Sequence, residues 1–216
     1  MSIRSLLDAF LALLFPDRCG GCARFGELLC QGCRASFQPY PYGSDRFPAS
    51  LSDVWITFLF SGPLREVVHQ FKYRSVRRLA QPLGMLMAAS LARHPLVADA
   101  VLPVPLHRDR LAERGFNQAE ELAREVAQAL HLPLIGNRLS RTRATEQQAR
   151  LDARARAENM RGAFHWHGAA TPHCVLLVDD VLTTGATMDA CAKALRTAGV
   201  EVVYGLALAR SRPDRG

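Results

Sequence analysis

The chain has 216 residues, 49% of them hydrophobic, which is enough for one domain core and a small addition. Lysine and arginine number 27 and aspartate and glutamate 20, so the formal net charge is +7. This balance favours polyanions, whether phosphorylated metabolites, pyrophosphate or nucleic acid. No segment reaches the roughly 18 uninterrupted apolar residues of a membrane span, so we expect a cytoplasmic protein that is not transmembrane.

The N-terminal stretch after Arg4 is apolar, and its side chains fall on one helical face: Leu6, Leu7, Phe10, Leu13 and Leu14. This spacing favours a short amphipathic helix packed on the protein. An export signal is the competing interpretation, but Asp8 interrupts the apolar run and no small-x-small cleavage site comes before Pro16. Docking on a membrane surface or a partner is a further alternative.

Four cysteines follow in the pattern C-x2-C-x7-C-x2-C: Cys19, Cys22, Cys30 and Cys33. The two short gaps contain glycine, so each allows a tight knuckle whose two thiolates point at one ion. Four such thiolates make a closed tetrahedral site, which is typical of structural zinc. Two disulfides in a secreted domain are the alternative, and a chain without an export signal favours the metal. A segment this short would need the metal to fold.

Proline and turn-forming residues between Gln38 and Pro48 indicate a linker. We therefore predict three parts: an N-terminal helix with a four-cysteine zinc module at 1–42, a linker at 43–50 and a main domain at 51–216. Because such a linker makes few contacts, we expect weak coupling between the two folded parts. The other two cysteines, Cys174 and Cys191, are most simply small core residues.

The first elements of the main domain are indicated by composition and spacing. β-branched and aromatic residues at 54–60 predict a strand, with a turn at 61–63. Apolar side chains from Leu64 to Phe71 then mark a helix whose other side carries Arg65, Lys72 and Arg74. A second helix is predicted at 79–92.

The next strand is expected to end near Leu102, because proline cannot sit inside a sheet ladder. Residues 103–108 then form a stiff loop at the carboxyl end of this strand, where α/β folds bind ligands. His107 and Arg108 lie in this loop, before a helix that runs to Leu130. A solvated loop histidine and a charged helix start are the alternatives for these two residues.

Residues of about 140–158 are rich in arginine and have few apolar anchors, so we expect them to be mobile without a ligand. A polar helix surface is the alternative. Beyond them, His165, Trp166 and His167 alternate like a short strand with exposed histidines, and no third ligand for a His-x-His metal site is apparent.

The most informative stretch is Val175–Thr187. An apolar run delivers two adjacent carboxylates, Asp179 and Asp180, and the loop Thr183-Thr-Gly-Ala-Thr187 follows them. Helical spacing to Ala198 and a new apolar run complete a βαβ unit. The start of the helix offers unpaired N–H groups to a phosphate, and the carboxylates suit sugar hydroxyls, Mg²⁺ or both. The site therefore looks built for a sugar phosphate. A buried strand ending in aspartates that cap the next helix is the plain alternative.

This acid pair and loop resemble the signature of the type I phosphoribosyltransferases. The resemblance implies that Asp179 and Asp180 hold the ribose hydroxyls of phosphoribosyl pyrophosphate (PRPP), and that Thr183, Thr184, Gly185, Ala186 and Thr187 cradle its 5′-phosphate. It further implies that the 103–108 loop with His107 and Arg108, Mg²⁺, and arginines such as Arg141 take the pyrophosphate. The catalytic residues would then be Asp179, Asp180 and Arg108.

The Pro-Val-Pro loop continuing to Arg114-Gly-Phe-Asn-Gln118, and the spaced residues ending in Gly162-Ala-Phe164, are similar to the ComF/GntX branch, a bacterial group linked to competence and use of external DNA. The expected fold is α/β and Rossmann-like, with a mostly parallel sheet and a small hood built from residues before 95 and around 162–166. Single-stranded DNA or proteins of the DNA-uptake machinery are the implied partners. A PRPP sensor without turnover and a DNA-binding accessory protein are the alternatives, and the acceptor substrate is not specified.

Overall fold

The computed structural model describes residues 16–41, 47–73, 76–92, 94, 96–142 and 162–211. The predicted N-terminal helix and residues 143–158 of the predicted mobile segment lie outside these ranges. Within them, no helix combines the length and the apolar character needed to cross a bilayer.

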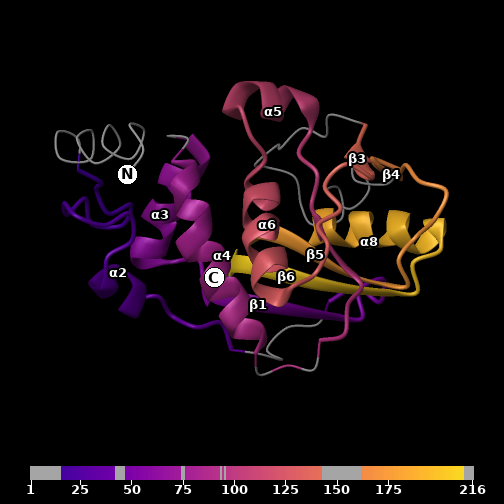
Figure 1. Cartoon of the computed structure of the whole chain (residues 1–216), viewed down its shortest axis with the longest axis horizontal. Helices are drawn as coiled ribbons and strands as arrows, with labels where there is room; N and C mark the ends of the chain where they lie inside the picture. Colours follow the sequence, from indigo (N-terminus) through magenta and orange to yellow (C-terminus); the bar gives the residue numbers. More distant parts are fainter. Residues whose placement is uncertain are drawn as a thin grey trace, which may run out of the picture.

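A parallel sheet of four strands forms the centre of the molecule (Figure 1), in the order β1 (Asp53–Leu59), β6 (Val202–Arg210), β5 (Cys174–Leu182) and β2 (Ala100–Pro103). Residues 174–178 of β5 are all buried, because helices cover both faces of the sheet at this strand. The expected α/β fold with a mostly parallel sheet is confirmed.

Two apolar layers sandwich the sheet. On one face Leu176 and Val178 pack with the helices α3 (Gly62–Tyr73), α4 (Ala80–Leu91) and α6 (Gln118–Leu130), and the short η1 (Arg77–Leu79). On the other face Val175 and Leu177 pack with α8 (Ala186–Ala198) and the antiparallel hairpin of β3 (Leu139–Arg141) and β4 (Phe164–Trp166). Strand alternation assigns residues 175–178 of β5 to these two layers.

The two segments expected to form one hood lie on opposite faces. Residues before 95 supply the edge strand β1 and the helices α3 and α4, whereas β4 packs over α8. Within the predicted hood segments, α3 and α4 therefore lie on one face of the sheet and β4 lies on the other. Apolar side chains such as Phe71 and Phe164 are buried in separate cores, and this separation keeps the two segments apart.

The cysteine module is tightly joined to the main domain (Figure 1, indigo end), against the expectation of weak coupling. Its helix α2 (Gln31–Ala35) packs on α3, and Phe37 meets Phe58 edge-on with ring centroids 5.3 Å apart. The chain after it runs along β1, where Leu59 N–H donates to the Gln38 carbonyl at 2.8 Å. Phe37, Leu28 and Leu29 join the core of α3, so the module and the domain share one hydrophobic interior.

Pro103 is the last residue of β2 and pairs in register with Val178, one residue beyond the predicted end of the strand. Backbone direction explains why it fits. Two residues earlier, Val101 N–H points away from β5 and donates to Pro133 O at 2.9 Å. The nitrogen of Pro103 faces the same way, so its missing hydrogen removes no bond to β5.

Candidate functional site

The acid pair lies within β5 and not in the loop after it, because the strand continues to Leu182. Adjacent strand residues point to opposite faces of a sheet. Asp180 therefore shares the face of Leu176 and Val178, toward α3, and Asp179 shares the face of α8 and the β3–β4 hairpin. Each carboxylate has a different electrostatic environment as a result.

Asp180 is buried and paired with Lys72 from the last turn of α3. The Lys72 Nζ lies 2.9 Å from both carboxylate oxygens. Val181 N–H donates to Oδ1 at 2.5 Å, and the Asp180 N–H donates to the Asp179 carboxylate at 2.8 Å. Lysine and backbone donors thus hold the Asp180 carboxylate in one orientation at the carboxyl edge of the sheet.

Asp179 is half-buried with few counter-charges. Burial, followed by the charge of Asp180, raises the pKa of Asp179 to about 7. The charges of Lys72 and Arg141 oppose this rise. Arg141, in β3, is half-buried with its guanidinium 5.7 Å from the centre of the Phe164 ring, and burial lowers the pKa of this arginine. The structure thus brings the predicted ligand Arg141 to the Asp179 side of the sheet.

Residues 183–185 connect β5 to α8, and Ala186 and Thr187 are the first two residues of that helix. Thr183 and Thr184 are exposed, and Ala186 N–H donates to the Thr184 hydroxyl at 3.4 Å. Gly185 precedes the first residue of α8 with φ of 80°, a left-handed conformation that favours glycine. Helix α8 therefore begins with backbone N–H groups beside the end of β5, a geometry that suits an anion.

The loop after β2 reaches the same edge. Its first residue, Val104, donates its N–H to Val178 O at 2.8 Å, and Asn117 Nδ2 donates to Val104 O at 3.1 Å. His107 is buried and caps α5 (Arg108–Arg114), accepting from Asp109 N–H at 3.4 Å. Arg108 has 90% of its side chain exposed, with Nε 3.6 Å from an Asp109 carboxylate oxygen. Of the two, the arginine is therefore free to reach a ligand in solvent.

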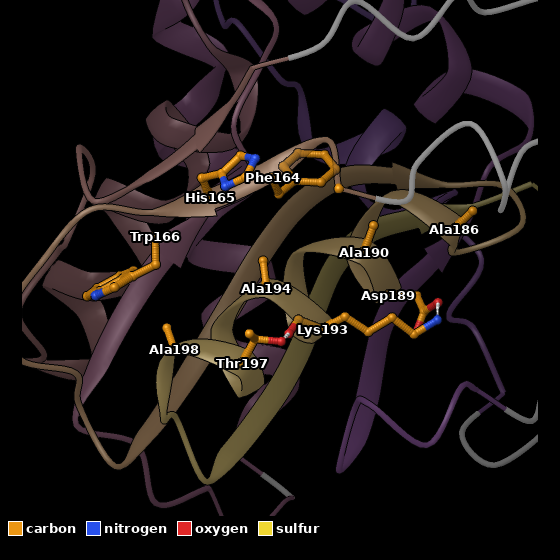
Figure 2. A pocket seen from close by; sticks show the side chains of 11 residues that line it. Phe164, His165, Trp166, Ala186, Asp189, Ala190, Lys193, Ala194, Thr197 and Ala198 are labelled. Atoms are coloured by element: carbon orange, nitrogen blue, oxygen red, sulfur yellow. Dashed lines mark hydrogen bonds and ion pairs between the residues drawn. The ribbon is translucent and has the colours of Figure 1, made fainter.

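A separate hollow of about 430 Å³ lies between α8 and β4. Figure 2 shows β4, with Phe164, His165 and Trp166, on one side of it and the alanines of α8 on the other, with Asp189 and Lys193 paired at one side, their charged atoms 2.7 Å apart. This hollow reaches Ala186, the first residue of α8, and contains neither carboxylate of the acid pair. His165 is exposed on β4, as expected.

The four N-terminal cysteines converge as predicted. Their sulfur atoms all lie within 4.8 Å of one another, and Cys22 and Cys30 are 3.7 Å apart. With metal–sulfur bonds of about 2.3 Å, a tetrahedron has sulfur atoms about 3.8 Å apart, so the cluster fits. Backbone N–H groups of Gly21, Cys30 and Cys33 point at the sulfurs, with N···S distances of 3.4 to 3.5 Å.

Electrostatics at the cluster favour a bound cation. Burial alone would raise the pKa of Cys19, but N–H donors, led by that of Cys30, outweigh it and lower the pKa to about 6. Burial and then the neighbouring thiols raise the pKa of Cys33 strongly. Four thiolates cannot all ionise at this spacing without a positive charge among them. The cluster can therefore hold a metal ion such as zinc.

Comparison with known proteins relates this architecture to a family. Residues 111–215 match the family described as "Phosphoribosyl transferase domain". "Competence protein F" of Haemophilus influenzae is 30% identical over 207 residues, covering 85% of this chain and 90% of that protein. The chain belongs to the ComF family.

Other ComF-like relatives agree. "DNA utilization protein YhgH" of Escherichia coli is 30% identical over 201 residues, covering 89% of this chain and 88% of that protein. "Competence protein ComFC" of Streptococcus pneumoniae is 28% identical over 153 residues, covering 71% of this chain and 66% of that protein. The matched domain begins at residue 111, so Lys72 and the four N-terminal cysteines of this ComF-family chain lie outside it.

Sequence reasoning missed two residues of this ComF-family chain. Lys72 was assigned to the solvated side of its helix, yet its side chain is 19% exposed and meets Asp180. Its position directly after the apolar Phe71 was a weak indication that Lys72 could be buried. Asp189 is buried in the first turn of α8, pairs with Lys193 and accepts from the Ser50 hydroxyl. The partner Ser50 lies 139 residues away in sequence, so no local pattern could reveal it.

Proposed function

We propose that this protein binds PRPP, transfers its phosphoribosyl group to a nucleophilic acceptor, and serves DNA uptake or the use of external DNA. One observation carries the proposal. A carboxylate pair for sugar hydroxyls, a helix N-terminus for a phosphate, and the loop after β2 all meet at the carboxyl edge of one parallel sheet. The names of the relatives support the link to DNA.

In this proposal Asp179 and Asp180 accept hydrogen bonds from the ribose hydroxyls. The 5′-phosphate lies in the loop of residues 183–187, where the left-handed Gly185 lets the backbone approach. The exposed Thr183 and Thr184 contribute hydroxyl donors. These contacts fix the sugar and leave its anomeric carbon toward the loop after β2.

Pyrophosphate departs toward the 103–108 loop, with Arg108 and Arg141 as its cationic partners. Magnesium bound with PRPP would supply further neutralisation of the leaving group, and the carboxylate oxygens at this edge suit a hard cation. The buried His107 caps α5 and so positions Arg108 at the mouth of the loop. In this scheme binding and charge neutralisation, and not proton transfer, lower the barrier.

We further propose that the cysteine cluster holds structural zinc, since four thiolates close every coordination position. The six cysteines are free thiols in the structure. A thiolate site needs a reducing compartment, which supports the cytoplasm as the place of action.

A second function is favoured by one observation on the cysteine module. Phe25 is 56% exposed, and the Arg18 guanidinium stacks on its ring at 3.9 Å. A hollow of about 630 Å³ beside it is lined by Arg24 and Gln31. An exposed aromatic ring among arginines suits stacking with unpaired bases, so we propose single-stranded DNA as the partner of this face. Phe25→Ala should weaken binding of a labelled oligonucleotide, and binding should fall steeply with salt.

The experiment for the transferase is release of pyrophosphate from PRPP with a panel of bases, amines and DNA, together with calorimetry of PRPP and Mg²⁺. Wild type should bind PRPP and Asp180→Asn should bind it at least tenfold more weakly, since a charge-assisted hydrogen bond contributes about 1.5–3 kcal/mol. Glu201→Gln, an exposed carboxylate-to-amide change just before β6, at the opposite edge of the sheet, is the matched control.

The outcomes of this experiment distinguish a transferase from a PRPP sensor. PRPP binding with pyrophosphate release supports the transferase. Binding that depends on Asp180 without release for any acceptor supports a PRPP sensor. If wild type and Asp180→Asn bind PRPP equally, or neither binds it, the assignment of the acid pair is wrong.

A further inference from the structure

Helix α3 lies beside α2 of the cysteine module (Figure 1) and also contacts Asp180 of the acid pair. Its first turn contacts the first knuckle: a methyl group on Gly21 would come within 3.2 Å of Pro63 Cβ and 2.9 Å of Cys33 Sγ. A methyl group on Gly20 would lie 3.6 Å from Val67 Cα. The same helix ends with Lys72 on Asp180. One short, rigid element therefore touches both sites.

Both ends of this connection are well packed. Leu64, Val67 and Val68 are fully or almost fully buried, and Leu28 and Leu29 of the cysteine module pack against their core. The other end is anchored by Phe71, whose ring centroid lies 5.6 Å from that of Phe116. Because a packed helix moves as a unit, a shift of the knuckle must change the packing at one of these two ends of α3.

The Lys72–Asp180 pair has the features of a positioning contact. Lysine has three N–H donors and no acceptor, so it can hold the carboxylate in one orientation while a sugar hydroxyl donates to it. Both side chains are mostly buried, at 19% and 11% exposure, so the contact is shielded from solvent. Buried pairs of this kind are strongly disturbed when one partner is removed.

We propose that Lys72 is the positioning residue for Asp180, and that the first cysteine knuckle, residues 19–22, holds it in place through α3. Metal at the cysteines then controls ligand affinity at the acid pair. This inference rests on the proposed binding of PRPP at Asp180. The cysteine module would then help to position the residues that bind PRPP.

The first arm of the test measures PRPP affinity by calorimetry with Mg²⁺ present. Lys72→Met should lose roughly tenfold or more, as expected for two groups in direct contact, and Lys72→Arg should recover part of the loss. Arg65→Met removes the same charge from an exposed position of α3 and should bind like wild type. Equal affinity of Lys72→Met and wild type would overturn the proposal.

The second arm removes the metal with a chelator. Wild-type affinity for PRPP should fall, whereas Lys72→Met, which already lacks the contact, should change little. If both proteins weaken by the same factor, or wild type does not weaken, the coupling through α3 is wrong. Should the metal-free chain unfold by circular dichroism, Gly21→Ala replaces chelation, because it keeps all the cysteines of the cluster while its methyl group crowds both Cys33 Sγ and Pro63.

A third measurement needs no PRPP. A double-mutant cycle of Lys72→Met and Asp180→Asn in denaturant unfolding reports the coupling in the free protein, with Gly21→Ala as background. Coupling that is present in wild type and lost in the Gly21→Ala background supports the link even if PRPP does not bind, in which case only the proposed function fails. Coupling that is the same in both backgrounds would overturn the link.

Discussion

The N–H of Val104 donates to the carbonyl of Val178 at 2.8 Å, which fixes the start of the loop after β2 beside the residue that precedes the acid pair. This bond continues the β2–β5 ladder past Pro103. The segment after Val104 then leaves the sheet. The N–H of Asp180, on β5, donates to the Asp179 side chain and not to β2. Because the loop leaves β5 at this point, the carboxyl edge of the sheet beside the acid pair is open to a ligand.

Asn117→Ala should loosen this loop. Asn117 caps α6 by accepting from Ala119 N–H at 3.1 Å, and its amide also holds the Val104 carbonyl. Loss of the cap alone costs about 1 kcal/mol of unfolding free energy. We expect weaker binding of inorganic pyrophosphate by calorimetry, with exposed Asn137→Ala as control. Unchanged pyrophosphate affinity in the Asn117 variant would show that the loop after β2 does not contribute to binding pyrophosphate.

Gly185→Ala should weaken PRPP binding through the backbone. A Cβ at this position meets nothing within 4 Å, so the cost comes from the φ of 80° and not from a clash. This strain is about 1 kcal/mol, which the loop relieves by turning its N–H groups away from the phosphate. Gly136→Ala, at an ordinary contact distance of 3.5 Å from Glu120, is the control for titration with PRPP.

Asp179→Asn should change how stability depends on pH. The pKa of Asp179 rises from 3.8 to about 7 on folding, so the folded chain holds more protons than the unfolded chain between these values. Stability from this group therefore falls as pH rises from about 4 to 7. The variant should gain stability relative to wild type across that window and keep the gain above it. Denaturant unfolding at several pH values measures this, and a constant difference would contradict it.

Elemental analysis of protein purified without added metal should find one zinc per chain. Cys30→Ala should abolish it, because the variant loses one of the four clustered sulfur atoms, the one 3.7 Å from Cys22 Sγ. We expect this variant to lose several kcal/mol of stability, as when a structural metal site is removed. Cys174→Ala, a buried cysteine outside the cluster, should keep the zinc.

Phe37→Ala tests the shared interior of module and domain. The ring is 6% exposed and packs edge-on against Phe58, so its loss should cost about 3–5 kcal/mol. A chain beginning at Ser50 should be less stable still, because it uncovers Leu64, Val67 and Val68. Thermal unfolding measures both. A truncated chain as stable as wild type would show that the main domain needs no module.

Much of the site was predictable from local sequence. The strand, acid pair, glycine-bearing loop and helix follow one another directly, so periodicity and the φ requirement of Gly185 predict them without distant contacts. The spacing of Cys19, Cys22, Cys30 and Cys33 likewise predicts one cluster, because two knuckles separated by seven residues can close on a single ion. These features depend on neighbouring residues, so the local sequence is enough to predict them.

Tertiary packing decided the rest. Lys72 lies 108 residues before Asp180, and its pairing depends on how α3 docks against the sheet. The linker's composition predicted loose modules, yet Phe37 entered the core of α3 because burial of an aromatic ring outweighs the turn-forming residues around it. Pro103 stayed in β2 because its nitrogen faces away from β5. Sequence determined the groups that can bind a sugar phosphate and a metal, whereas packing over long sequence separations decided which helix connects them.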